Sequence, residues 1–174
     1  GQLYSSEHIG TPKVSAMENI IGQYSRSGSF IKRMERIENT TESMTQVTPF
    51  CISAFDNMKA RRDLFDLWKI EATRYYEEMR QRISEQITFL NSIPQESKKP
   101  YEEHLAKLYA SPVPFFIDGR LEVEQMQVFF VTLSEVDEYE KHLFDDANVP
   151  ELSCSLKQTS HSAAMIGSTI TALY

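Results

Sequence analysis

Residues 111–139, SPVPFFIDGRLEVEQMQVFFVTLSEVDEY, decide between two fold classes for this chain of 174 residues. The apolar run 115–117, the Asp118-Gly119 pair and the alternation of apolar and acidic residues after it are typical of a β-hairpin that turns at Asp-Gly. A second apolar run, 128–131, would supply the returning strand. This interpretation gives an α+β domain with a small hairpin at 113–131.

The same stretch also fits a helix. Asp118 is a good N-cap, Glu122 and Glu124 suit the positive end of a helix, and no glycine or proline occurs from Arg120 to Asn148. An isolated two-stranded hairpin is marginal in water, and no other segment of the chain reads as a strand. We therefore favour a helix, or a hairpin plus helix, over 119–147, in a fold that is mainly α.

Apolar residues at spacings of three and four predict a first helix over 14–47. Ser15 and Glu18 fit a capping box at its start. Gly22 and Gly28 each weaken a helix by roughly 1 kcal/mol relative to alanine, so a kink near 25–29 is expected.

A second, longer helix is predicted over 49–92. Thr48-Pro49 offers an N-cap followed by proline at the first helical position, and no glycine or proline intervenes before Pro94. The apolar stripe includes Trp68, which we expect to be buried. A helix of this extent spans about 60 Å, so the two helices predict an elongated antiparallel hairpin or bundle with coiled-coil character.

The remaining segments are shorter. Pro100 opens a helix over 100–110 with Leu105, Leu108 and Tyr109 turned inward, and Ser134 to Asp137 matches a second capping box. The tail, 153–174, is rich in Ser and Thr and ends in a short helix. We expect residues 1–174 to form a single helical domain.

Charge is unevenly distributed along the chain. Residues 1–100 carry 14 Lys and Arg against 13 Asp and Glu, a net of +1, whereas residues 101–174 carry 4 against 12, a net of −8. The total of −7 argues against nucleic-acid binding, which normally needs a basic balance. The asymmetry indicates either docking of the two halves on each other or a basic protein partner.

The basic residues gather in two clusters. In the predicted antiparallel hairpin these clusters lie level with each other, which gives a docking patch for an acidic protein or for anionic lipid at a membrane surface. Its partner-binding candidates are Arg61, Arg62, Lys69, Lys32, Arg33 and Arg36. For Arg61 and Arg62 we favour contact with a partner, because they interrupt the apolar stripe.

Catalytic, cofactor-binding and metal-ligating residues are not predicted, and no cofactor is expected. The chain has no nucleophile elbow, phosphate-binding loop or dinucleotide fingerprint. His142 has acidic neighbours, but no second histidine completes a metal site. Cys51 and Cys154 form no CxxC pair, which favours a reducing, cytoplasmic location, and no run is long and apolar enough to cross a membrane.

These observations predict a non-enzymatic helical module for protein–protein interaction or scaffolding, with self-association through the long stripe as one form of it. The first alternative is a peripheral membrane-binding module that uses the basic patch. The second alternative is a small helical enzyme or metal protein centred on His142.

Overall fold

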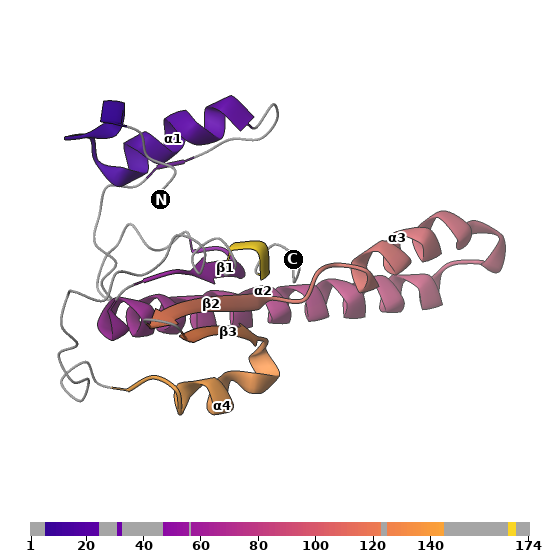
Figure 1. Cartoon of the computed structure of the whole chain (residues 1–174). Helices are drawn as coiled ribbons and strands as arrows, with labels where there is room; N and C mark the ends of the chain where they lie inside the picture. The colour runs from indigo at the N-terminus through magenta and orange to yellow at the C-terminus, as the bar shows by residue number, and fades with distance from the viewer. Residues whose placement is uncertain are drawn as a thin grey trace.

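The structure, a computed structural model, describes residues 6–24, 31–32, 47–55, 57–122, 125–144 and 167–169. Its longest element is one helix that lies along a small sheet and extends well beyond it (Figure 1). The elements are, in order, η1 (Ser6–His8), α1 (Lys13–Tyr24), β1 (Phe50–Ser53), α2 (Met58–Ser92), η3 (Gln95–Ser97), α3 (Lys99–Tyr109), β2 (Phe115–Glu122), β3 (Gln125–Val131), η4 (Leu133–Glu135) and α4 (Val136–Glu140).

The sheet has three strands in the order β1-β2-β3. β1 pairs in parallel with β2, with Phe50 opposite Phe115, and β2 pairs antiparallel with β3, with Ile117 opposite Phe130. α2, η3 and α3 form the crossover that a parallel pair requires. The fold is therefore α+β, and the prediction of a mainly α, all-helical bundle or coiled coil is wrong.

Within residues 111–139, β2 and β3 form the hairpin and the short helices η4 and α4 follow it, in place of one continuous helix over 119–147. Asp118 and Gly119 do not make its turn: both lie inside β2, and the last pair of residues between β2 and β3 is Glu122 with Gln125. The objection that a hairpin lacked strand partners failed because the third strand, β1, lies in a segment that we read as helix. The capping box before α4 is formed by Thr132 and Glu135, two residues earlier than predicted.

The long helix begins at Met58, not at residue 49. Thr48 and Pro49 precede β1, and the side chain of Asn57 caps α2 by accepting a 2.8 Å hydrogen bond from the Ala60 backbone N–H. β1 was missed because it has only four residues, too few to distinguish a period of two from a period of 3.6.

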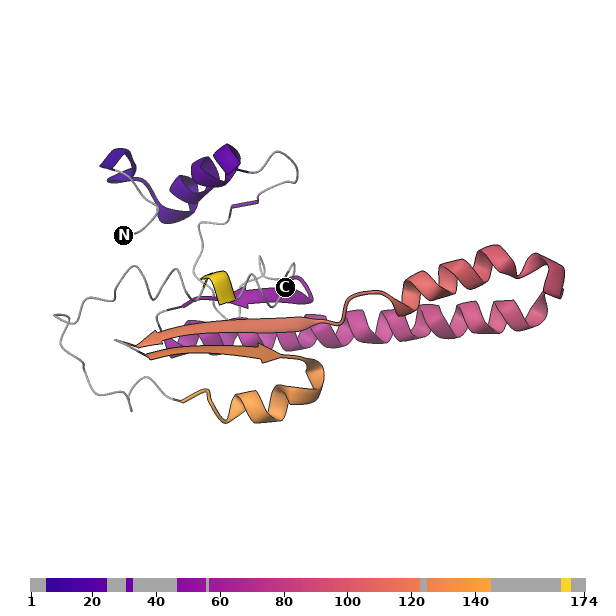
Figure 2. The same cartoon turned by 45° about the vertical axis from the view of Figure 1, so that its right-hand side comes forward.

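The first helix ends at Tyr24, and Ile31 and Lys32 are not helical, so the hairpin of two long helices does not exist. α1 stands apart from the sheet and from α2 in both views (Figures 1 and 2). Several predicted features lie outside the described residues. They are the kink at 25–29, residues 33–46 of the predicted 14–47 helix, the end of 119–147, and the 153–174 tail apart from the helical residues 167–169.

The main core lies between α2, the sheet and α4. Trp68 is fully buried, as predicted, and its indole N–H donates a 2.9 Å hydrogen bond to the Pro49 carbonyl. The ring of Phe65 packs against Trp68 at 5.5 Å, against Phe116 of β2 at 5.2 Å and against Tyr139 of α4 at 4.7 Å. Each such burial contributes about 1.5–3 kcal/mol, so these aromatic rings fix α2 on the sheet.

Candidate interaction surface

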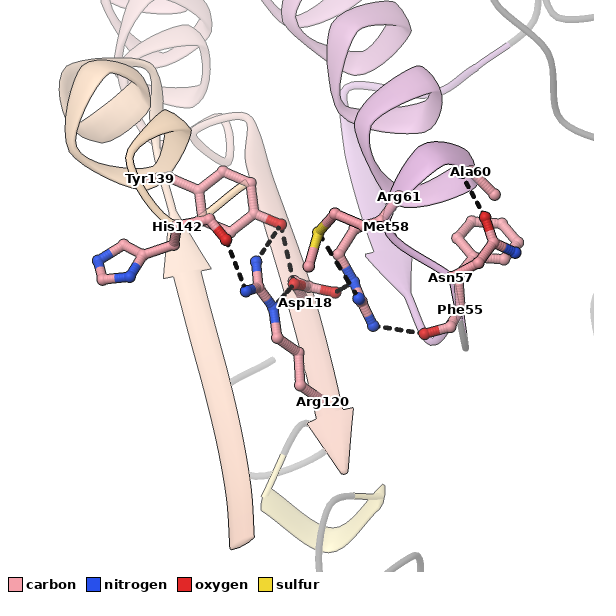
Figure 3. Close-up of polar contacts among 9 residues, drawn as sticks. All are labelled: Phe55, Asn57, Met58, Ala60, Arg61, Asp118, Arg120, Tyr139 and His142. Carbon is pink, nitrogen blue, oxygen red and sulfur yellow. Dashed lines mark hydrogen bonds and ion pairs between the residues drawn. The ribbon is translucent and has the colours of Figure 1, made fainter. Parts of the chain in front are cut away.

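The first feature to consider as a site is a polar cluster at the start of α2 (Figure 3). Its centre is Asp118, a fully buried residue of the middle strand. Arg61 Nε lies 2.7 Å from Asp118 Oδ1, and Arg120 Nε lies 2.6 Å from Oδ2. The Tyr139 hydroxyl donates to Oδ2 at 2.8 Å. One carboxylate thus accepts from α2, from its own strand and from α4.

The two guanidinium groups have further partners. Arg61 donates to the Phe55 carbonyl, and Arg120 donates to the His142 carbonyl at 2.8 Å. The Arg120 guanidinium also lies 4.5 Å from the centre of the Phe129 ring, within the range of a cation–π contact. Burial and the neighbouring Asp118 carboxylate raise the pKa of Tyr139 above its ordinary value.

This cluster joins elements and does not offer a reactive surface. Asp118 and the Arg61 side chain are closed to solvent, at 0% and 7% exposure, so a substrate cannot reach the carboxylate. Sequence reasoning used Asp118 only as a turn residue or helix cap. The one signal that pointed to its role was its position directly after the apolar run 115–117, where a buried charge needs a partner.

The predicted partner-binding residues of α2 are all engaged within the chain. Arg61 pairs with Asp118, Arg62 donates to the Leu143 carbonyl, and Lys69 Nζ lies 2.6 Å from a Glu140 carboxylate oxygen. The hydrogen bond that Lys69 donates to the Glu140 carboxylate raises the pKa of Lys69. Basic α2 residues therefore contact the C-terminal half, which is the internal docking that the charge asymmetry allowed.

The second basic cluster lies elsewhere. Lys32 Nζ is 2.6 Å from a Glu18 carboxylate oxygen of α1, whereas Arg33 and Arg36 lie outside the described residues. The helical hairpin that was expected to align the two clusters is absent. Recognition of a partner by these six residues stays a prediction.

His142 and Cys51 were the other residues considered for chemistry. The His142 ring packs 4.9 Å from the Phe129 ring, and within the described ranges no three His, Cys, Asp or Glu side chains gather as metal ligands would. Burial raises the pKa of Cys51 to about 12, so its thiol stays protonated and weakly nucleophilic at neutral pH. Cys154 lies outside the described residues.

The second feature is an arm, which we define as residues 73–110. Beyond Ala72, α2 runs on for 20 residues to Ser92, a length of about 30 Å. α3 folds back beside it, and together they project from the sheet (Figures 1 and 2). Leu90 is the only arm residue that is buried.

Apolar side chains on the arm face solvent. The tip is held by Phe89 and Tyr101, whose ring centres are 4.9 Å apart, and by a 3.3 Å hydrogen bond from the Gln86 side chain to the Tyr101 carbonyl. Leu105 and Leu108 are half-buried, but Tyr109 is exposed, contrary to the prediction that it turns inward. The large exposed hydrophobic residues of the arm are Tyr76, Ile87, Phe89, Tyr101 and Tyr109.

Comparisons of the chain with protein-family models, with curated proteins and with solved structures find no match. No helix among the described segments has the length and apolar character needed to cross a membrane.

Proposed function

We propose that this chain is a non-enzymatic protein–protein interaction module and that the arm is its contact surface. The observation that carries the proposal is the projection of residues 73–110 from the sheet with Leu90 as their only buried side chain. A segment kept only for its own domain's core would bury more. Exposed aromatic residues are the kind of side chain that dominates the energetics of protein interfaces.

The body of the domain serves as the base of the arm in this proposal. Phe65, Trp68 and Ala72 fix the first half of α2 on the sheet, and the ion pair of Arg61 with Asp118 anchors its first turn. A rigid base lowers the ordering entropy that binding through the second half of α2 would otherwise cost. We place the module in a reducing compartment such as the cytoplasm, because Cys51 is a free thiol.

Capture from native extract tests the proposal with matched charge-introducing variants. Ile87→Glu combined with Tyr109→Glu places carboxylates on the arm, and Ile70→Glu places one on the part of α2 that lies on the sheet; all three side chains are exposed. We expect the wild type and Ile70→Glu to retain the same specific binding proteins and the double variant to lose them. Retention of those proteins by a folded double variant would remove the arm as the contact surface.

A further inference from the structure

The arm leaves its inward apolar stripe partly uncovered. Met79 and Ile83 follow one another at helical spacing on the line that leads to Leu90, yet both are only half-buried. Two helices side by side cover each other along one seam and leave both flanks open to water. A bundle of four helices would enclose such a stripe.

The charge on the arm narrows the choice of partner. Residues 73–110 carry 6 Lys and Arg and 6 Asp and Glu, a net charge of zero. The rest of the chain carries 12 Lys and Arg and 19 Asp and Glu, which is the whole net charge of −7. Several arm charges are already paired: Arg74 with Glu71 and Glu78, and Arg80 with Glu77 at 3.9 Å. The arm therefore suits a partner surface that is neutral overall and exposes aromatic side chains, and the arm itself has both properties.

The length of the arm also favours pairing with an identical arm. Two bodies of net charge −7 repel each other, but antiparallel arms hold them at opposite ends, about 30 Å apart. This separation exceeds the Debye length of about 8 Å at physiological ionic strength, so the repulsion is largely screened. In a dimer formed by direct contact of the two bodies, this repulsion would be screened much less.

We propose that two copies of this chain associate through their arms, antiparallel about a two-fold axis, to complete a four-helix bundle. This inference rests on the proposed function and names its partner as a second copy. A face about 30 Å long and roughly 20 Å wide offers on the order of 600 Å² per copy, below the roughly 800 Å² per partner of a standard interface. The dimer is accordingly weak and depends on concentration.

Sedimentation equilibrium of the full chain over low to high micromolar concentrations tests the inference. We expect a monomer–dimer equilibrium in the wild type and in Ile70→Glu. Ile87→Glu and, separately, Tyr109→Glu should each raise the dissociation constant at least about tenfold, the usual effect of losing a well-packed interface side chain. Circular dichroism checks that each variant keeps its helix content, and the use of two arm variants guards against one that fails to fold.

The outcomes separate this inference from the proposed function. A wild type that stays monomeric throughout overturns the dimer, as does a dimer that both folded arm variants preserve or that Ile70→Glu alone abolishes. If the chain is monomeric but the arm variants still lose proteins captured from extract, the arm is a contact surface for a different protein. Loss of dimer in the arm variants alone supports the bundle.

Discussion

At the scale of the residue, Asp118 should matter most for stability, because two guanidinium groups and a phenol are paired with its one buried carboxylate. Asp118→Asn keeps the side chain's shape but removes its charge, which leaves Arg61 and Arg120 without a counter-ion. Breaking a buried ion pair by neutralising one partner costs about 3–5 kcal/mol. We expect a loss of stability of that size in chemical denaturation.

The matched control for this change is an ion pair at the surface. Lys141 and Glu138 pair with side chains that are 67% and 68% exposed, and exposed pairs contribute about 0–1 kcal/mol. Lys141→Gln should therefore barely alter the unfolding midpoint. If Asp118→Asn is as mild as Lys141→Gln, the cluster is not the anchor of α2 described above.

For Ser53 we expect a substitution to have the opposite effect on stability. It is fully buried beside Asp118 in the register of β1 and β2, and its hydroxyl has no hydrogen-bond partner within the described part of the chain. An unsatisfied buried hydroxyl costs about 1–3 kcal/mol. Ser53→Ala should leave stability unchanged or raise it, measured by the same denaturation. A clear loss of stability would mean that the hydroxyl is satisfied.

The half-buried Cys51 thiol and the buried Tyr139 hydroxyl should make stability fall at alkaline pH. The pKa of Cys51 is raised to about 12 and that of Tyr139 is raised above its ordinary value, both mainly by burial. A group whose folded pKa is raised contributes stability below its unfolded pKa and loses it as pH rises toward the folded value. Stability should hold up to about pH 9 and decline above it, by at most about 1.4 kcal/mol per pH unit for each group.

Cys51→Val isolates the contribution of the thiol. Valine suits a strand, has no ionisable group and keeps the apolar packing against the core. The wild type and the variant should show parallel stabilities below about pH 8, and the variant should decline less steeply above about pH 9. Identical slopes over pH 9–11 in urea denaturation would contradict the assignment to Cys51.

At the scale of the element, the start of α2 is decided by a side-chain cap. Asn57 accepts from the Ala60 backbone N–H, whereas Thr48, which resembled a cap in the sequence, lies before β1. Asn57→Ala should lower stability by about 1 kcal/mol, the usual loss on removing an N-cap. Thr48→Ala should lower stability by less in the same thermal melts. A larger loss for Thr48→Ala than for Asn57→Ala would support a helix that starts at residue 49.

These two residues show how far the sequence could predict the fold. Both are good caps, and spacing of apolar residues over 49–92 continues through β1 without a break, so local pattern alone could not place the start of the helix. The burial of Trp68 and the short helix after Pro100 were predictable, because a regular stripe and a proline are local signals. The pairing of Ile52 with Ile117 is contact between segments far apart in sequence, and local patterns do not carry it.

The candidate site was harder to predict for the same reason. Basic residues were chosen as the surface because charge is visible in a sequence, yet Arg61 is buried and paired with a residue 57 positions away. The arm was hidden inside a stripe that also serves the core: Trp68 and Ile83 share one pattern, but only Trp68 meets the sheet. Periodicity shows which side of a helix is apolar, but it does not show how many of its turns pack against other elements.

At the scale of the whole molecule, the single helix α2 belongs to two units of different stability. From Met58 to Ala72 it shares the main core with the sheet and α4. From residue 73 onward only Tyr75 still meets the sheet, with its ring 5.7 Å from that of Phe50, and Leu90 is the only buried residue. Local opening free energies follow such differences in buried contact. The helix backbone is continuous across Ala72, but the free energy of local opening should fall there.

Native-state hydrogen exchange can follow that change along α2. At concentrations where the chain is monomeric, amides around Phe65 and Trp68 should exchange only through global unfolding, while those over 76–89 should show protection at least roughly tenfold lower. Raising the concentration should protect 76–89 selectively if the arms pair, because association adds burial there and nowhere in the base. Uniform protection along the whole helix would instead mean that arm and body unfold as one unit.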